Sequence, residues 1–268
     1  MPIITLLSDF GLKDPYVAEM KATILSICPD SQIIDISHKI EKFNIRIGAF
    51  ILASATPYFP IGTIHVAVVD PGVGTERRSI IVETTLCFYV GPDNGLLMLS
   101  AERQGIRHVY QISNPQYILP RVSRTFHGRD IFAPAAAHLA RGCLPSEFGH
   151  ETYNYVFPHF AEPSLRGSKL TGEVLNMDDF GNVITNISVQ DLEKIKVQEG
   201  SLLQVRFGHR VLTLKLCSAY GEVPAGELLT VIGSHDFLEI ALNQGSAAQA
   251  LKAQVGNLVR ISSLITSP

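Results

Sequence analysis

Strand-like apolar runs alternate with helical patterns through the first 157 residues, and this alternation limits the fold more than any other feature. Residues 3–7 form a continuous apolar run, typical of a strand buried on both faces. Asp14 and Pro15 then predict the N-cap and first residue of a helix that continues over residues 16–27. Such alternation favours a mainly parallel sheet with helices on both faces. The sequence therefore predicts an N-terminal α/β domain over residues 1–157.

The pattern changes after this point. Residues 158–169 contain two prolines and no clear period, which predicts a linker. Short β-type runs separated by turn residues follow, at residues 170–175, 183–187, 202–207, 210–216, 228–232 and 237–242. This spacing indicates a compact β-barrel or sandwich over residues 170–268, smaller than the first domain.

Composition excludes several classes of protein. With 46% hydrophobic and 18% charged residues, the chain is a folded globular protein. Its net charge of −3 and lack of a basic run argue against nucleic acid as a partner. The four cysteines form no CxxC pair, so neither a zinc site nor a disulfide framework is indicated. No apolar run approaches the ~18 residues of a membrane span, and the first eight residues are too short for a signal peptide. We therefore expect no membrane association and a cytoplasmic location.

A carboxylate and two guanidinium groups lie at the ends of neighbouring strands. Asp70 ends the apolar run of residues 64–69, and Arg77 and Arg78 precede the run of residues 79–85. Ligands of open α/β sheets bind at this edge. A solvated β-turn with a surface ion pair is the alternative, since Asp and Gly are ordinary turn residues.

Two further segments of the first domain carry polar groups after a strand or before a helix. Asp9 follows the first strand, where a carboxylate can accept hydrogen bonds from both hydroxyls of a ribose. His127 precedes an alanine-rich helix and can exchange protons near neutral pH. Either residue could instead cap or pack. No glycine-rich phosphate loop accompanies them, which suits an adenosine-type ligand without a polyphosphate.

The second domain offers two polar turns. Residues 178–182, Asp-Asp-Phe-Gly-Asn, provide carboxylates for an amine, an aromatic ring for stacking and an amide for a base edge. Ser234 lies in the other turn. An ordinary β-turn is the alternative for residues 178–182.

Metal dependence is not expected. The residue types of a metal hydrolase are present, but no two of them have the spacing of a ligand pair. They are Asp9, His38, His65, Asp70, Asp93 and His127. His65 lies in the middle of a strand, where a core position is the simpler interpretation.

Together these segments resemble one family, in its own order along nearly the whole chain. They are Ser8–Gly11, Ile27–Asp30, Val69–Arg78, Gly91–Gly95, Thr125–Asp130, Asp179–Asn182 and Gly233–Ser234. The family is that of the S-adenosyl-L-methionine (SAM) hydroxide adenosyltransferases, relatives of the fluorinase and chlorinase enzymes. The resemblance implies an α/β domain followed by a β-barrel, and a homotrimer with active sites at the interfaces between subunits. It implies hydrolysis of SAM to adenosine and L-methionine without a cofactor, SAM being the substrate.

The resemblance also implies roles for single residues. A water molecule is oriented and activated by the set Asp70, Arg77 and His127. The substrate is bound by Asp9 at the ribose, Phe180 and Asn182 at adenine, and Asp178 and Ser234 at methionine. Asp179 is an alternative to Asp178, because the motif can slip by one residue. Phe43 stands where the halogenases carry a bulky aromatic near the ribose, and the chain departs from the family at residues 235–237.

Two other functions are alternatives. A halogenase would carry an uncharged residue in place of Asp70, since a carboxylate repels a halide. His127, the lack of a hydroxyl at Gly128 and the short connection at residues 84–87 also favour water. The other alternative is a non-catalytic sensor of an adenosyl ligand, in which the Asp70, Arg77 and His127 set serves structure alone.

Overall fold

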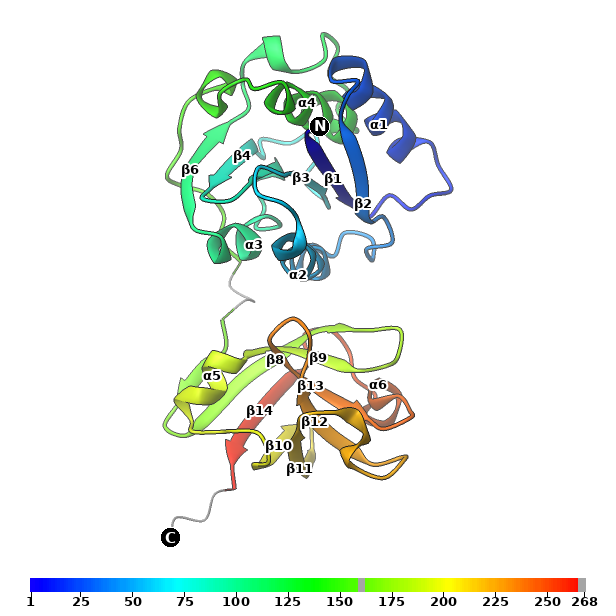
Figure 1. Ribbon diagram of the computed structural model, residues 1–268, viewed down its shortest axis with the longest axis vertical. Helices are drawn as coiled ribbons and strands as arrows, with labels where there is room; N and C mark the ends of the chain where they lie inside the picture. The colour runs from blue at the N-terminus through cyan, green and yellow to red at the C-terminus, as the bar shows by residue number, and fades with distance from the viewer. Residues whose placement is uncertain (159–161, 265–268) are drawn as a thin grey trace. The chain divides into compact units, whose positions relative to one another are not determined.

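The chain folds into two compact units, Met1–Pro158 and His159–Pro268. The computed structural model describes residues 1–158 and 162–264 (Figure 1). The linker predicted over residues 158–169 thus falls partly outside the described residues, at 159–161. A short strand, β7 (Ser164–Arg166), occupies part of the remainder.

A six-stranded sheet forms the centre of the first unit, in the order β2-β1-β3-β5-β4-β6. β2, β1, β3 and β5 run parallel to one another, and β4 is antiparallel to both of its neighbours, β5 and β6. The strands are β1 (Ile3–Ser8), β2 (Gln32–Ser37), β3 (Ile64–Val68), β4 (Ser79–Thr84), β5 (Phe88–Pro92) and β6 (Ile106–Gln111). The predicted mainly parallel sheet is confirmed.

Helices cover both faces of this sheet, as predicted. Figure 1 shows α1 and α4 on one face and α2 and α3 on the other. Their bounds are α1 (Tyr16–Ile27), α2 (Ile45–Ala55), α3 (Met98–Arg103) and α4 (Ala133–Ala140). Short turns of 3-10 helix lie at η1 (Thr56–Tyr58), η2 (Pro115–Tyr117) and η4 (Pro145–Phe148), and a π-helical turn, η3 (Gly128–Phe132), leads into α4.

The start of α1 differs from the prediction by one residue. Pro15 itself is the N-cap, and no side chain, that of Asp14 included, caps the helix. Pro15 already has helical backbone angles, and its carbonyl accepts from the Glu19 N–H at 2.9 Å. The helix α1 therefore begins at Tyr16. The helix α2, in contrast, does have a side-chain cap: the Asn44 side chain accepts from the Ile47 N–H at 3.1 Å.

The second unit is a closed β-barrel, which settles the choice between barrel and sandwich. Its strands follow the order β14-β10-β11-β12-β13-β9-β8, and β8 pairs with β14 to close the circle; β7 is added to β8. The strands are β8 (Lys169–Met177), β9 (Val183–Ser188), β10 (Leu202–Phe207), β11 (Arg210–Cys217), β12 (Leu228–Ile232), β13 (Phe237–Leu242) and β14 (Leu258–Ser263).

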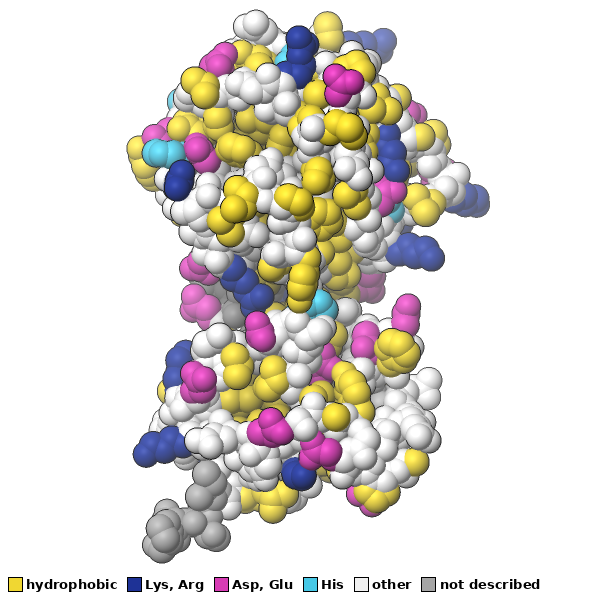
Figure 2. All heavy atoms as spheres, in the orientation of Figure 1, with side chains coloured by type: hydrophobic (Ala, Val, Ile, Leu, Met, Phe, Trp, Pro, Cys, Tyr) yellow, Lys and Arg dark blue, Asp and Glu magenta, His cyan; other side chains and the backbone are white. Residues whose placement is uncertain are grey.

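Three short helical segments accompany the barrel: α5 (Val189–Lys194), η6 (Tyr220–Glu222) and α6 (Ala247–Leu251). Inward-facing side chains such as Val205, Leu238 and Ile261 are fully buried and form its core. On the face shown in Figure 2, Lys and Arg side chains are scattered among acidic and apolar ones. Within residues 1–158 and 162–264, no helix combines the length and apolar character that crossing a membrane requires.

Candidate active site

Asp70 lies just beyond the carboxyl end of β3, the position at which α/β sheets bind ligands. The exit of this strand is fixed by Asn94, whose Nδ2 donates to the Val69 carbonyl at 2.9 Å. Asn94 also accepts from the Leu96 N–H at 3.1 Å, which holds the amide in place. The carboxylate is therefore presented by a braced strand end rather than by a free turn.

The Arg77 guanidinium connects Asp70 to His127. Its Nε donates to Asp70 Oδ1 at 3.1 Å, and Nη2 donates to Asp70 Oδ2 at 2.5 Å and to His127 Nδ1 at 3.0 Å. Nη1 donates to the Arg78 carbonyl and to Ser79 Oγ, both at 2.9 Å. All five N–H groups of Arg77 thus have partners, which fixes the plane of the guanidinium.

These contacts determine the protonation of His127. A guanidinium can only donate, so the His127 Nδ1 atom must accept and carries no proton. The neutral ring then carries its proton on Nε2. Burial, followed by the positive charge of Arg77, lowers the pKa of His127 and favours this neutral form. The Asp70 and Arg77 side chains are only 5% and 8% exposed, so this is a buried ion pair next to a neutral imidazole.

Gly74 allows the loop after β3 to contact the segment before His127. Its φ of +76° lies in the left-handed region, and a Cβ placed there would lie 2.1 Å from the Arg124 carbonyl oxygen. Only glycine permits this approach. It helps bring Arg77 to a histidine that is fifty residues away in the sequence.

Arg78, the second arginine of the motif, has a different role. Its Nε donates to Asp93 Oδ2 at 2.8 Å and its Nη1 to Thr152 Oγ1 at 3.1 Å, while Nη2 donates to the Asn154 carbonyl. Asp93 also accepts from the Val156 N–H at 2.8 Å. This second Asp–Arg pair, with Asp93 buried and Arg78 partly exposed, fastens the end of the first unit to the sheet and makes no contact with Asp70.

Asp9 lies beside Asp70 at the same sheet edge. β1 and β3 are parallel neighbours with Ser8 opposite Val68, so both carboxylates follow adjacent strand ends. Asp9 is 6% exposed, and its Oδ2 accepts from the Phe43 N–H at 2.9 Å. Phe43 has a φ of +64° and an exposed ring, an uncommon conformation for an aromatic residue. Strained residues of this kind concentrate at functional sites.

In the second unit, Asp178 organises the turn between β8 and β9. Its Oδ1 accepts from the N–H groups of Phe180 and Asn182, at 3.1 and 2.8 Å, and its Oδ2 accepts from Asn182 Nδ2 at 2.9 Å. These bonds leave the Phe180 ring 83% exposed and the Asn182 side chain buried. Asp179 and Ser234 are exposed.

A buried carboxylate in β13 was not among the predicted site residues. Glu239 is 6% exposed, its Oε2 accepts from the Tyr220 hydroxyl at 3.0 Å, and its Oε1 lies against Gly233. Burial and the nearby charge of Asp178 raise the pKa of Glu239. The sequence did carry a signal, because this is a lone acidic residue within an apolar strand.

The six residues of metal-ligand type have other partners or positions. His65 is a core residue: it is fully buried, accepts from or donates to Thr5 Oγ1 at 2.8 Å, and burial lowers its pKa to about 3. His38 makes the corresponding bond to Ser8. In the described parts of the chain, residues 1–158 and 162–264, no three His, Cys, Asp or Glu side chains gather as a metal site would require.

Comparison with known proteins assigns this chain to a family. The N-terminal domain of the SAM hydroxide adenosyltransferases matches residues 4–149, and their C-terminal domain matches residues 172–260. An (R)-S-adenosyl-L-methionine hydrolase of Thermus thermophilus is 39% identical over 95% of this chain and 97% of its own length. The enzyme of the same name from Methanocaldococcus jannaschii is 36% identical over 94% and 92%.

More distant relatives and solved structures agree. A fluorinase of Nocardia brasiliensis is 30% identical over 97% of this chain and 96% of its own. The crystal structure of an uncharacterized conserved protein from Thermotoga maritima superposes with a TM-score of 0.91 at 40% identity, over 97% of this chain and 99% of that one. The resemblance drawn from the sequence motifs is confirmed: this chain belongs to the SAM hydroxide adenosyltransferase family.

Proposed function

We propose that this protein hydrolyses SAM to adenosine and L-methionine, with water attacking C5′ of the ribose. The hydrogen-bonded set of Asp70, Arg77 and His127 at the carboxyl edge of the sheet is the observation that supports this most. The hydrolases among its relatives, at 36–39% identity over nearly full length, support the same reaction.

The reaction needs no general acid and only a modest general base. As the water oxygen bonds to C5′, the bond from C5′ to sulfur breaks, and its electron pair stays on sulfur. Methionine leaves as a neutral thioether, so no group has to protonate it. The attacking oxygen becomes a protonated alcohol, which is a strong acid. A carboxylate next to the attacked carbon can accept that proton.

In this mechanism Asp70 is the proton acceptor and His127 is the positioning group. Both Asp70 oxygens are bound by Arg77, but a carboxylate offers about four lone-pair sites, so it still has capacity for the water. The Nε2–H of His127 faces the Ser123 backbone, so the ring is fixed from both sides and holds the Arg77 guanidinium, and through it the Asp70 carboxylate, in place for the water. Placement of the reacting groups can lower a barrier by up to roughly 7–11 kcal/mol, more than general-base catalysis alone supplies.

The remaining predicted residues bind the substrate. Asp9 accepts hydrogen bonds from the ribose hydroxyls, next to the exposed ring of Phe43. In the second unit, the exposed Phe180 ring stacks on adenine beside Asn182. Asp178 and Ser234 serve the methionine end. Because Asp178 is occupied with its own turn, the exposed Asp179 is the alternative partner for the amine.

The halogenase alternative is less well supported. A buried carboxylate at Asp70 disfavours a halide. A Cβ at Gly128 would lie 3.2 Å from both the Met20 sulfur and the Phe126 ring, so a hydroxyl side chain there would force its neighbours to shift. The strands β4 and β5 are joined by a tight turn, in which the Thr84 N–H donates to the Cys87 carbonyl at 3.0 Å. The fluorinase of Nocardia brasiliensis is also less similar to this chain, at 30% identity, than the Thermus thermophilus hydrolase, at 39%.

The proposal includes a homotrimer with active sites at the interfaces between subunits. The exposed aromatic rings of Phe43 and Phe180 support it, since large apolar side chains at the surface mark interaction or ligand sites.

We also propose that the protein is located in the cytoplasm. All four of its cysteines are free thiols, and a reducing compartment keeps thiols in this form.

Incubation of the purified protein with SAM, with and without excess chloride or fluoride, tests the proposal once the products are separated by chromatography. We expect adenosine and methionine in equal amounts, unaffected by halide. A 5′-halo-5′-deoxyadenosine product would assign the protein to the halogenases. Ligand retained without turnover would identify a sensor.

A further inference from the structure

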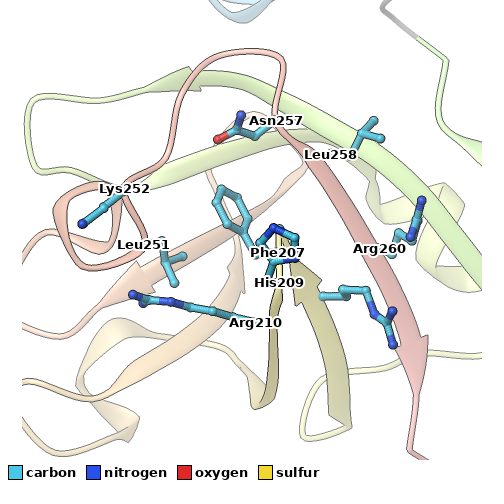
Figure 3. A pocket seen from close by; sticks show the side chains of 10 residues that line it. Phe207, His209, Arg210, Leu251, Lys252, Asn257, Leu258 and Arg260 are labelled. Carbon is cyan, nitrogen blue, oxygen red and sulfur yellow. The ribbon is translucent and has the colours of Figure 1, made fainter.

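A cavity of about 530 Å³ opens in the second unit, between the β10–β11 turn, α6 and the start of β14. Figure 3 shows Phe207 and His209 at its centre, with Arg210 and Lys252 on one side and Arg260 on the other. None of the residues proposed to bind SAM lines it. Its volume lies within the range of about 300–1,000 Å³ typical of small-molecule sites.

The lining is strongly cationic. It contains three arginines, a lysine and a histidine, and it contains no acidic side chain. The chain as a whole is net negative, at −3, so this concentration of positive charge does not follow from composition. Such a cavity attracts anions.

Two of the arginines oppose each other directly. In the antiparallel pair of β10 and β14, Arg206 stands opposite Arg260. Like charges in this arrangement are destabilising. Among the residues that the structure describes, neither arginine forms an ion pair that would offset the repulsion. An anion bound between them would offset it.

The other cationic groups are held at the same cavity. Arg210 Nη1 donates to the Ala250 carbonyl at 2.8 Å, which directs the side chain toward α6. Lys252 is the C-cap of α6 with a φ of +53°, a conformation that favours glycine. A lysine at this position therefore carries a conformational cost, which is consistent with a use for its charge.

The cavity also has an apolar part. Phe207 and Leu251 are buried at its base, and Leu258 is exposed at its edge. Arginines recognise phosphate groups through paired N–H donors, and aromatic and aliphatic surfaces hold a planar base. We propose that this cavity binds a nucleoside polyphosphate, with the phosphates on the arginines and the base against the exposed side chain of Leu258.

Isothermal titration calorimetry with ATP, inorganic tripolyphosphate and adenosine tests the proposal. ATP should bind at one site per chain, and more tightly than tripolyphosphate does, because only ATP uses the apolar part. Binding of ATP should weaken as salt is added. Adenosine serves as the probe of the separate SAM site.

The decisive variant is Arg260→Glu, with Arg166→Glu as its control. Arg166 is exposed on β7 and does not line the cavity, so both variants change the net charge equally. Arg260→Glu should weaken ATP binding by about tenfold or more, which corresponds to about 1.4 kcal/mol. It should melt no lower than the parent, because the new carboxylate would face Arg206, and its adenosine binding and SAM turnover should be unchanged. Arg166→Glu should leave ATP binding intact.

Absence of binding by both ATP and tripolyphosphate would overturn the proposal, as would an equal loss of affinity in the two variants. Equal affinity for ATP and tripolyphosphate would overturn the nucleoside contact and identify an inorganic polyphosphate as the ligand of the arginines.

Discussion

Replacing Asp70 with asparagine tests the proposed proton acceptor while keeping the shape of the side chain. Asp70 accepts two N–H bonds from Arg77, at 3.1 and 2.5 Å, and both side chains are more than nine-tenths buried. Asparagine offers one oxygen and one NH₂ group, so one N–H of Arg77 would face another donor. Breaking a buried charged pair costs about 3–5 kcal/mol. We expect Asp70→Asn to lose that much stability and to stay folded.

The effect on catalysis should be larger than the effect on binding. Loss of a positioned proton acceptor lowers kcat by about 10²–10⁴-fold. Adenosine binding, which we assign to Asp9 and the second unit, should change by no more than about twofold, well below the 1.4 kcal/mol of a tenfold change. Steady-state formation of adenosine gives kcat, calorimetry gives the adenosine affinity, and thermal unfolding gives stability.

Asp93→Asn is the matched control. Asp93 forms the other ion pair with an arginine. Its own side chain is 2% exposed, that of Arg78 is 30% exposed, and its hydrogen bonds do not reach Asp70 or His127. This variant should lose less stability than Asp70→Asn, because Arg78 is partly hydrated, and it should retain kcat. If Asp70→Asn kept kcat within about threefold, or if Asp93→Asn lost as much, the assignment of Asp70 as the proton acceptor would be refuted.

Further predictions concern binding, a loop and two titrating groups. Asp9→Ala should weaken adenosine binding about tenfold or more, since a hydrogen bond to a charged group contributes about 1.5–3 kcal/mol; unchanged affinity in calorimetry would remove the ribose assignment. Gly74→Ala should lower kcat and cost about 2 kcal/mol or more, from strain and the clash with a backbone carbonyl. Gly62→Ala, with a similar φ and nothing within 4 Å, should cost less and keep kcat; equal effects would contradict the close approach. Because the pKa of His127 is lowered, kcat should be constant across neutral pH and fall only below the ordinary histidine pKa of about 6.5. A pH–rate profile in which kcat already falls above pH 6.5 would argue against a neutral ring. Because the pKa of Glu239 is raised, this carboxyl group binds its proton more tightly in the native protein than in the unfolded chain, so stability falls as pH rises from about 4.5 through the folded pKa. In unfolding measured against pH, Glu239→Gln should lose this dependence. A stability curve of the variant that runs parallel to that of the parent protein would contradict the raised pKa.

Local patterns in the sequence were sufficient to predict most of the elements. The helix over residues 16–27 and the strands over residues 202–207, 228–232 and 237–242 lie where their periodicity predicts them. The strand that closes the barrel, β14, was not predicted, although the buried Val259 and Ile261 alternate with the exposed Leu258 and Arg260. Closure depends on pairing β14 with β8, nearly ninety residues earlier in the chain, and no local pattern encodes that partner.

The candidate site was predictable in its residue types and its place at the sheet edge, because parallel strands put their carboxyl ends together. The different roles of Arg77 and Arg78 were not predictable, since both precede β4 and either could have faced Asp70. The acceptor role of His127 Nδ1 also depends on a long-range contact. That contact needs the approach of two loops at Gly74, which only the folded chain shows.

The most direct test of the central claim is the source of the oxygen in the adenosine product. Turnover of SAM in water labelled with a heavy oxygen isotope, followed by mass spectrometry, reports which bond the water forms. Attack at C5′ predicts one heavy oxygen in the 5′-hydroxyl of adenosine and none in methionine. Unlabelled adenosine would contradict hydrolysis at C5′ and the catalytic role proposed for Asp70, Arg77 and His127.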